Sequence, residues 1–488
     1  MNISLVIIFV FLAFAIFLGI RARRGKDMSL EQWSVGGRDF GTLFVFLLLA
    51  GEIYTTFTFL GGSGWAYGEG GPAFYILAYG CLAYIISYWL LPAIWRYAKE
   101  HRLHSQSDFF TKKYESKGLG VLVSLVAVVA MVPYLSLQFK GLGLIVSEAS
   151  YGAISSTVAI IIGVAAVTAY TSISGIHGSA WTAVLKDIMV LVVVVFMGLY
   201  LPFVFHGGIG DMFREINAQK PDFLTLPNEG YSPAWFVSTV MLTALGFFMW
   251  PHYFTSAFSA ENERIFKRNA IFMPLYQLVL LFVFFVGFAA LLQVPGLEGS
   301  AVDLSLLRVS KEAFGPVLLG LIGAAGVLTA LVPGSIIMMV SATVLAKNVY
   351  RVFAPSTSER TTGTLARLLV PAVALVALVF TLNSGDTIVI LLLLGYSLVT
   401  QLFPALIFSL TPNNFVTKWG AGAGILAGVS TVTYVTITET TIGQLLPFLP
   451  QSVADTNIGI IALFVNFVVL LAVSFATGGL AVRREQSA

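Results

Sequence analysis

The stretch LLLAGEIYTTFTFLGGSGWAY, residues 47–67, decides how this chain folds. It carries a carboxylate, Glu52, about ten residues into an apolar segment, where an ionisable group is rare unless it faces a cavity or a partner. Three glycines follow at Gly61, Gly62 and Gly64. Glycines weaken a helix and free backbone carbonyls, which lipid cannot satisfy. The stretch therefore predicts a membrane helix that is broken around Gly61–Gly64, as in transporters with a midplane site.

Composition supports a membrane protein throughout. The 488 residues are 57% hydrophobic and 10% charged, whereas a soluble chain carries roughly a quarter charged residues. The net charge is only +3, and the basic residues are spread over short loops, so we expect no nucleic-acid partner. The single cysteine, Cys81, excludes an internal disulfide framework. The first apolar run, 3–20, lacks a preceding basic stretch and a cleavage motif, so we predict a retained helix.

Apolar runs of about 20 residues suffice to span a bilayer. They predict an all-α polytopic protein with about thirteen helices, at 3–20, 41–67, 73–97, 119–147, 154–174, 179–205, 233–257, 270–293, 315–346, 364–382, 386–410, 417–438 and 458–481. Lys and Arg gather in alternate loops, which places the N-terminus outside and the C-terminus in the cytoplasm. We expect a bacterial plasma-membrane protein that is a monomer or a weak homo-oligomer.

The inner part of the chain divides into two sets of five helices. Each set begins with an interrupted helix, and the second interruption is predicted at Trp250-Pro251-His252. Because each half has an odd number of helices, the halves are inverted relative to each other. The predicted units are a peripheral helix and loop, two five-helix repeats, and peripheral helices with a short tail: 1–35, 36–206, 207–411 and 412–488.

Three groups are candidates for a coupling-ion site. Glu52 is either a proton or cation acceptor or a structural carboxylate. Lys186, followed by Asp187, is either a lysine that reaches the headgroups or a buried ammonium that fills a cation site as a tethered charge. Pro333 and Gly334 predict a bend in segment 315–346, where Ser335 offers a hydroxyl; the alternative is a kinked packing helix.

Candidates for solute binding lie beside the two predicted breaks and on two further helices. His252 could titrate near neutral pH, although a lone histidine beside a break is more often structural. Gln138 is either a solute donor or an interhelical hydrogen bond. The remaining histidines lie in loops or at helix ends and carry no functional signal. The predicted solute-binding residues are Thr55, Thr56, Thr58, Gly61, Gly62, Gln138, Trp250, His252, Tyr253 and Gln401.

No metal-ligand cluster, catalytic triad or phosphate-binding glycine pattern occurs in the sequence. We therefore expect neither an enzyme nor a bound cofactor.

Several motifs together resemble the sodium:solute symporter family. They are Gly36-Gly37-Arg38, FLGGSGWAYGEG, PYLSLQFKGLG, SGIHGSAWTAVLKD and the Pro251-His252 pair. The resemblance implies a LeuT-like fold of five plus five inverted helices with flanking helices. Within the family, GEIYTTFTFLG, WPHYFTSAFSAENERIFKRNAIFMPLYQL and ALVPGSIIMMVSATVLAKNVY look most like bacterial monocarboxylate uptake permeases.

The chain departs from the family's sodium-coupled members at three positions together. Those members place a Ser-Thr pair where this chain has Val332-Pro333, an Asp where it has Ala183, and a Gln where it has Lys186. The resemblance thus implies coupling to a proton, or no sodium at that site.

We therefore expect a secondary symporter that imports a short monocarboxylate, such as lactate, pyruvate or acetate, together with a cation, H⁺ being favoured. One alternative is a Na⁺-coupled symporter of another small solute such as proline or pantothenate. A solute sensor with an appended domain is less favoured because the sequence ends directly after the last predicted helix, and a channel is a further alternative.

Overall fold

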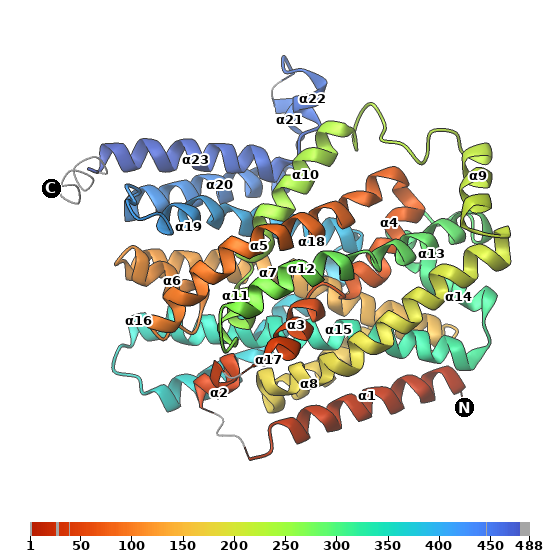
Figure 1. Ribbon diagram of the computed structural model, residues 1–488, viewed down its shortest axis with the longest axis horizontal. Coiled ribbons are helices and arrows are strands. Elements are labelled where there is room, and N and C mark those ends of the chain that lie inside the picture. Colours follow the sequence, from red (N-terminus) through yellow and green to blue (C-terminus); the bar gives the residue numbers. More distant parts are fainter. Residues whose placement is uncertain (1, 26–28, 39, 446, 479–488) are drawn as a thin grey trace.

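The computed structural model describes residues 2–25, 29–38, 40–445 and 447–478, and it is all-helical across them (Figure 1). The long apolar helices are α1 (Ile3–Ala22), α5 (Tyr75–Glu100), α7 (Lys117–Ala149), α8 (Ser156–His206), α15 (Pro316–Val344), α17 (Glu359–Asn383), α20 (Lys418–Thr438) and α23 (Ile458–Ala476). Two further spans are each built from two helices: α12 (Arg264–Gln277) with α13 (Leu280–Gln293), and α18 (Ile388–Val399) with α19 (Phe403–Ser409). Each overlaps a segment predicted from hydropathy. The predicted end of the last helix at residue 481, and the tail beyond it, lie outside the described residues.

Two further helices are interrupted. The first broken helix consists of α3 (Thr42–Gly51), the π-helix η2 (Phe57–Gly61) and α4 (Gly62–Glu69). The second broken helix consists of α10 (Pro233–Gly246), the 3₁₀ turn η4 (Phe247–Met249) and α11 (Pro251–Phe258), with a bend of 49°. Both interruptions lie inside segments that hydropathy predicts to span the membrane, 41–67 and 233–257.

Ten helices of the described residues are individually long and apolar enough to cross a membrane, or eleven if the bent pair counts as one span. The count of thirteen is therefore not confirmed. The ten or eleven spans leave out the first broken helix, of which α3 is too short to count, and they count α8 once. α8 has 51 residues, about 76 Å at 1.5 Å per residue, which is over twice the thickness of a bilayer core. It is interrupted at Gly175, whose φ of 59° and ψ of −161° end one helix and start the next.

The peripheral helices flank a buried centre. α20 and α23 run together along one edge in Figure 1, and α1 lies along the opposite edge. The central helix is α15. In its most apolar stretch, 83% of the residues are buried inside the molecule. Its glycines let neighbours approach closely, because a Cβ at Gly320 would lie 2.9 Å from Ser4 Cα of α1. α15 continues as helix through Pro333, and a bend at that residue stays a prediction.

Short segments join the two broken helices at one end of the molecule. α2 (Leu30–Val35) and the turn after it precede the first broken helix. There Phe40 N–H donates to the Ser259 carbonyl at 3.1 Å, and Glu261 N–H donates to the Phe40 carbonyl at 3.1 Å. These two bonds form an isolated parallel bridge between Phe40 and Ala260, directly after α11.

Candidate functional site

The first broken helix is interrupted at Glu52–Thr55, so the break predicted at Gly61–Gly64 is wrong. Those glycines lie within helix and serve close packing instead. A Cβ at Gly61 would lie 2.9 Å from Ile388 Cγ2, and one at Gly64 would lie 2.9 Å from the Val302 carbonyl oxygen. The actual break lies about nine residues nearer the N-terminus, directly at the buried carboxylate.

Two threonines explain why helix resumes after the break. Thr55 Oγ1 accepts the Phe57 N–H at 3.1 Å, and Thr58 Oγ1 accepts the Thr55 N–H at 3.0 Å. This reciprocal arrangement resembles a capping box, which satisfies amides that have no partner inside the helix. Thr55 and Thr58, predicted to bind solute, thus hold the backbone of the break in this structure.

Lys186 of α8 binds the backbone carbonyls that the break frees. Its Nζ donates to the Gly51 carbonyl at 2.9 Å and to the Tyr54 carbonyl at 3.0 Å. It also forms an ion pair with Asp187 Oδ1 at 2.9 Å. The lysine side chain is completely buried, so it does not reach the headgroups. The ammonium lies at the C-terminal end of α3, where the helix dipole favours a positive charge.

Glu52 lies on the other side of the same break and is fully buried. Its Oε1 accepts the hydroxyl of Ser256, from α11, at 2.5 Å. Its Oε2 lies 3.8 Å from His252 Nε2, which is beyond hydrogen-bonding distance. The carbonyl of Glu52 accepts the hydroxyls of Tyr134 at 3.0 Å and Tyr253 at 3.3 Å. The carboxylate therefore lies between the two broken helices.

The second broken helix is interrupted at Trp250, as predicted. Trp250 has extended backbone, with φ of −67° and ψ of 131°, the conformation favoured before a proline. The Met249 carbonyl, freed by the break, accepts Gln106 Nε2 at 2.6 Å. Gln106 belongs to α6 (Gln106–Lys113), the short helix between α5 and α7. A neutral amide thus holds this break, where an ammonium holds the first one.

Several buried polar atoms around the breaks make no hydrogen bond within the described residues. They are Glu52 Oε2, Thr56 Oγ1, Gln138 Nε2 and both ring nitrogens of His252. Gln138 is nevertheless close to the first break, because its Oε1 accepts the Thr56 N–H at 3.3 Å. Buried polar groups are normally paired, so these atoms provide both donors and acceptors for a small polar ligand. The rings of Tyr134 and Trp250 pack against each other beside these atoms, with their centroids 4.8 Å apart.

Other predicted site residues lie elsewhere. Gln401 donates to the carbonyls of Ser397 and Gly459, and its side chain accepts from Asn466 of α23, so it joins η7 (Thr400–Leu402) to the peripheral helix. Ser335 shares a hydrogen bond of 2.8 Å with Ser179. Gly62, like Gly61, packs against a neighbouring helix, in this case α13. The structure therefore does not bring Gln401, Gly61 and Gly62 together with Glu52.

Sequence reasoning missed Ser256 and Gln106. Ser256 lies four residues after His252 on the same helix, so both side chains share one face. That spacing could have identified it. Gln106 had no such signal, because it begins the short polar helix α6 and its role depends on a carbonyl more than a hundred residues away.

Two interrupted helices around a buried, charged centre in an all-helical membrane protein are typical of a secondary transporter. The chain belongs to the sodium:solute symporter family, whose model matches residues 33–428. It is accordingly a symporter and not an enzyme.

Relatives and a solved structure agree with this assignment. The chain is 66% identical over 477 residues to the uncharacterized symporter YhjB of Bacillus subtilis strain 168, covering 98% of each chain. It is 28% identical over 429 residues to a monocarboxylate transport permease protein of Rhizobium johnstonii, covering 84% of this chain and 83% of that one. A substrate-bound, outward-open Na⁺-coupled sialic acid symporter superposes with a TM-score of 0.79 at 16% identity, covering 97% of each chain. At that identity the likeness shows the fold, which is LeuT-like as expected.

Proposed function

We propose that this symporter imports a short monocarboxylate together with a proton, across the bacterial plasma membrane, with its Lys- and Arg-rich loops in the cytoplasm. The observation that carries the choice of ion is the position of Lys186. Its ammonium lies within 3.0 Å of two freed carbonyls and 2.9 Å from a carboxylate. Oxygen ligands of this kind suit a hard cation, and here the protein's own cation occupies them.

The neighbouring positions favour the same ion. Val332 and Pro333 of α15 lie on the helix that packs across from the break, and neither offers a side-chain oxygen. A Cβ at Gly51 would lie 3.3 Å from Lys186 Nζ and 3.8 Å from Val332 Cγ1. The space beside the freed carbonyls is thus bounded by an ammonium and an apolar side chain, which disfavours a second cation.

Glu52 is the proposed proton acceptor. It is buried between the broken helices, and its Oε2 has no hydrogen-bond donor. A bound proton would neutralise the carboxylate and remove its desolvation penalty. A proton moving inward gains about 2.3 kcal/mol per 100 mV of membrane potential, which can drive accumulation of the solute.

The proposed cargo rests on a relative and on donor chemistry. The relative from Rhizobium johnstonii is named a monocarboxylate transport permease. In this chain, Gln138 Nε2 is a free donor beside the first break, and Thr56 Oγ1 adds a hydroxyl. Amides at the N-terminal ends of the second half-helices favour an anionic group. Together these groups suit one small carboxylate.

The deciding experiment is uptake of labelled pyruvate, lactate and acetate into proteoliposomes, with proton and sodium gradients imposed separately. We expect an inward proton gradient to drive accumulation and replacement of Na⁺ by K⁺ to have no effect. Glu52→Gln should keep solute exchange but lose the response to the proton gradient. Uptake that depends strongly on Na⁺ and not on the proton gradient would overturn the proposal.

The alternative is a Na⁺-coupled symporter of another small solute such as proline or pantothenate. The name of the family, sodium:solute symporter, favours it. The same proteoliposomes separate the two proposals, because a sodium jump with a panel of solutes would then drive uptake while a pH jump would not.

A further inference from the structure

His252 lies beside both breaks, and the proposed transport mechanism gives it no role. The side chain is completely buried, and neither ring nitrogen has a hydrogen-bond partner within the described residues. Each of the four other histidines has a partner for at least one ring nitrogen: His101, His104, His177 and His206. His252 is therefore the exception among the histidines of this chain.

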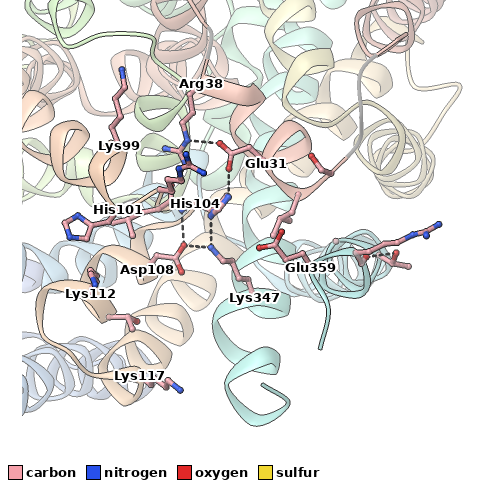
Figure 2. Close-up of a pocket in the computed structure, with 18 of the residues that line it drawn as sticks. Glu31, Arg38, Lys99, His101, His104, Asp108, Lys112, Lys117, Lys347 and Glu359 are labelled. Atoms are coloured by element: carbon pink, nitrogen blue, oxygen red, sulfur yellow. Dashed lines mark hydrogen bonds and ion pairs between the residues drawn. The ribbon is translucent and has the colours of Figure 1, made fainter. Parts of the chain in front are cut away.

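His104 shows the usual arrangement. It lies in the wall of a cavity of about 1900 Å³ at the end of the molecule that carries the basic loops (Figure 2). Its Nε2 contacts Glu31, and its Nδ1 lies 2.9 Å from Lys347 Nζ, so both ring nitrogens are paired. None of the residues placed around the two breaks lines this cavity, so the cavity is separate from the proposed solute site.

The unpaired ring of His252 faces a second unpaired atom. Glu52 Oε2 lies 3.8 Å from His252 Nε2, and it too lacks a hydrogen-bond partner in the part of the chain that the structure describes. This separation is too long for a direct hydrogen bond, but one oxygen atom can lie within about 2.8 Å of both atoms. Buried polar groups are normally paired, so the gap between these two atoms suits one oxygen of a ligand.

A hydroxyl oxygen fits this gap better than a keto oxygen or a methyl group does. A neutral imidazole offers one donor and one acceptor, and a hydroxyl can both donate and accept. A hydroxyl can donate to the Glu52 carboxylate, and it can accept from Glu52 once that group is protonated. A keto oxygen only accepts, so it pairs with Glu52 in the protonated state alone. A methyl group leaves both Glu52 and His252 unpaired.

The donors proposed for the solute carboxylate lie close to this gap. The Tyr134 hydroxyl donates to the Glu52 carbonyl at 3.0 Å, and the Tyr134 ring centroid lies 5.4 Å from that of His252. Gln138 follows Tyr134 by four residues on α7, so the two side chains share one face. The Gln138 side chain also accepts the N–H of Thr56 at 3.3 Å, which brings the unpaired Thr56 hydroxyl to the same place.

The spacing along α7 limits the length of the solute. Four residues of a helix advance about 6 Å, which is the interval from Tyr134, beside the gap, to Gln138. Two hydrogen bonds of about 2.8 Å take up most of that interval. The remaining length suits a hydroxyl on the carbon next to the carboxylate and disfavours a hydroxyl further along the chain.

We propose that the solute is a 2-hydroxy monocarboxylate of the lactate type, and that His252 together with Glu52 selects it through its hydroxyl group. Pyruvate, with a keto oxygen at the same carbon, should bind less well. Propionate, which has the same carbon chain without that oxygen, should bind least well. The inference rests on the proposed function, because it names the class of solute for that same site.

Lactate exchange in proteoliposomes tests this selection without a driving gradient. Vesicles that hold the full-length protein and unlabelled lactate take up labelled lactate, with equal pH and equal Na⁺ on both sides, while unlabelled acids compete from outside. Each buried group left unpaired should cost about tenfold in affinity. Half-inhibition should therefore need about tenfold more pyruvate than lactate and about 100-fold more propionate. 3-Hydroxypropionate, an isomer of lactate, should also compete about tenfold less well than lactate.

Two variants of His252 test its role. His252→Leu removes the pairing atoms, so the preference for lactate over propionate should fall to within about threefold. The loss should come from weaker lactate binding, whereas a purely structural role would weaken both acids alike. His252→Gln keeps a donor and an acceptor and should retain a preference of about tenfold. His101→Gln is the control, because His101 lines the separate cavity and stacks on Tyr97 (Figure 2), and it should keep the wild-type preference.

The wild-type competition decides the matter even where a variant does not fold. Propionate that competes within about threefold of lactate overturns the inference alone, and so does exchange of labelled acetate or pyruvate without exchange of lactate. An unchanged preference in His252→Leu likewise overturns selection by His252. A protein that exchanges none of the labelled monocarboxylates overturns the proposed function, and this inference with it.

Discussion

The two broken helices differ in what holds their open backbone. In the first, the carbonyls of Gly51 and Tyr54 bind the Lys186 ammonium, which is paired with Asp187. In the second, the Met249 carbonyl binds the neutral amide of Gln106. The first break is held by a buried charge from the long helix α8, and the second by a neutral amide from the short helix α6.

This difference separates two ways of keeping a helix open at membrane depth. The second break is set locally, because a proline after Trp250 forces extended backbone whatever surrounds it. The first break contains no proline and depends on groups that come from another helix. The geometry of the first break should therefore change when the charge of Lys186 or Asp187 is removed, while the geometry of the second break should not.

The largest expected effect is that of Lys186→Met. This change leaves two freed carbonyls without a donor and Asp187 buried without its cation. Removing one partner of a buried ion pair costs about 3–5 kcal/mol, so thermal unfolding in detergent should shift strongly downward and transport should be lost.

The double variant Lys186→Met/Asp187→Asn is the matched control for that change. It removes the uncompensated carboxylate, so part of the lost stability should return while transport stays absent. A single Lys186→Met variant with wild-type stability would mean that the first break does not depend on charge.

An intermediate effect is expected at the second break. Gln106→Ala leaves the Met249 carbonyl unpaired, and an unsatisfied buried acceptor costs about 1–3 kcal/mol. The unfolding midpoint should fall less than for Lys186→Met, and transport should persist because the proline still sets the break. A larger loss than for Lys186→Met would reverse the comparison.

The smallest effect is expected from Thr58→Ala, which removes the cap that restarts the first broken helix. Loss of such a cap costs about 1 kcal/mol. Thr343→Ala serves as a control, because the Thr343 hydroxyl donates only to the carbonyl four residues back, that of Met339. Equal unfolding midpoints for the two variants would show that the cap contributes nothing beyond a buried hydroxyl.

The sequence located the second break correctly and the first one incorrectly, for a physical reason. Proline acts on the residue before it, so its effect can be predicted from two neighbouring positions. Glycine only permits unusual backbone or close approach, and which of these it serves depends on the neighbour. At Gly61 the neighbour is Ile388, which no local pattern reveals.

Other features of the site needed three-dimensional contacts. Hydropathy predicted a polytopic helical protein, and Glu52 and Lys186 stood out because charge is rare in apolar segments. Hydropathy could not show that the Lys186 side chain points into the protein rather than to the lipid headgroups, because the same sequence is compatible with both orientations. Gln401 looked like a lining residue, but its partners lie on α23, far along the chain.

The bridge between Phe40 and Ala260 has a mechanical consequence. Two backbone hydrogen bonds tie the segment leading into α3 to the end of α11. Moving either broken helix without the other would break both bonds, each worth about 1 kcal/mol. The two broken helices should consequently move together, so that a displacement of one is passed on to the other through these two bonds.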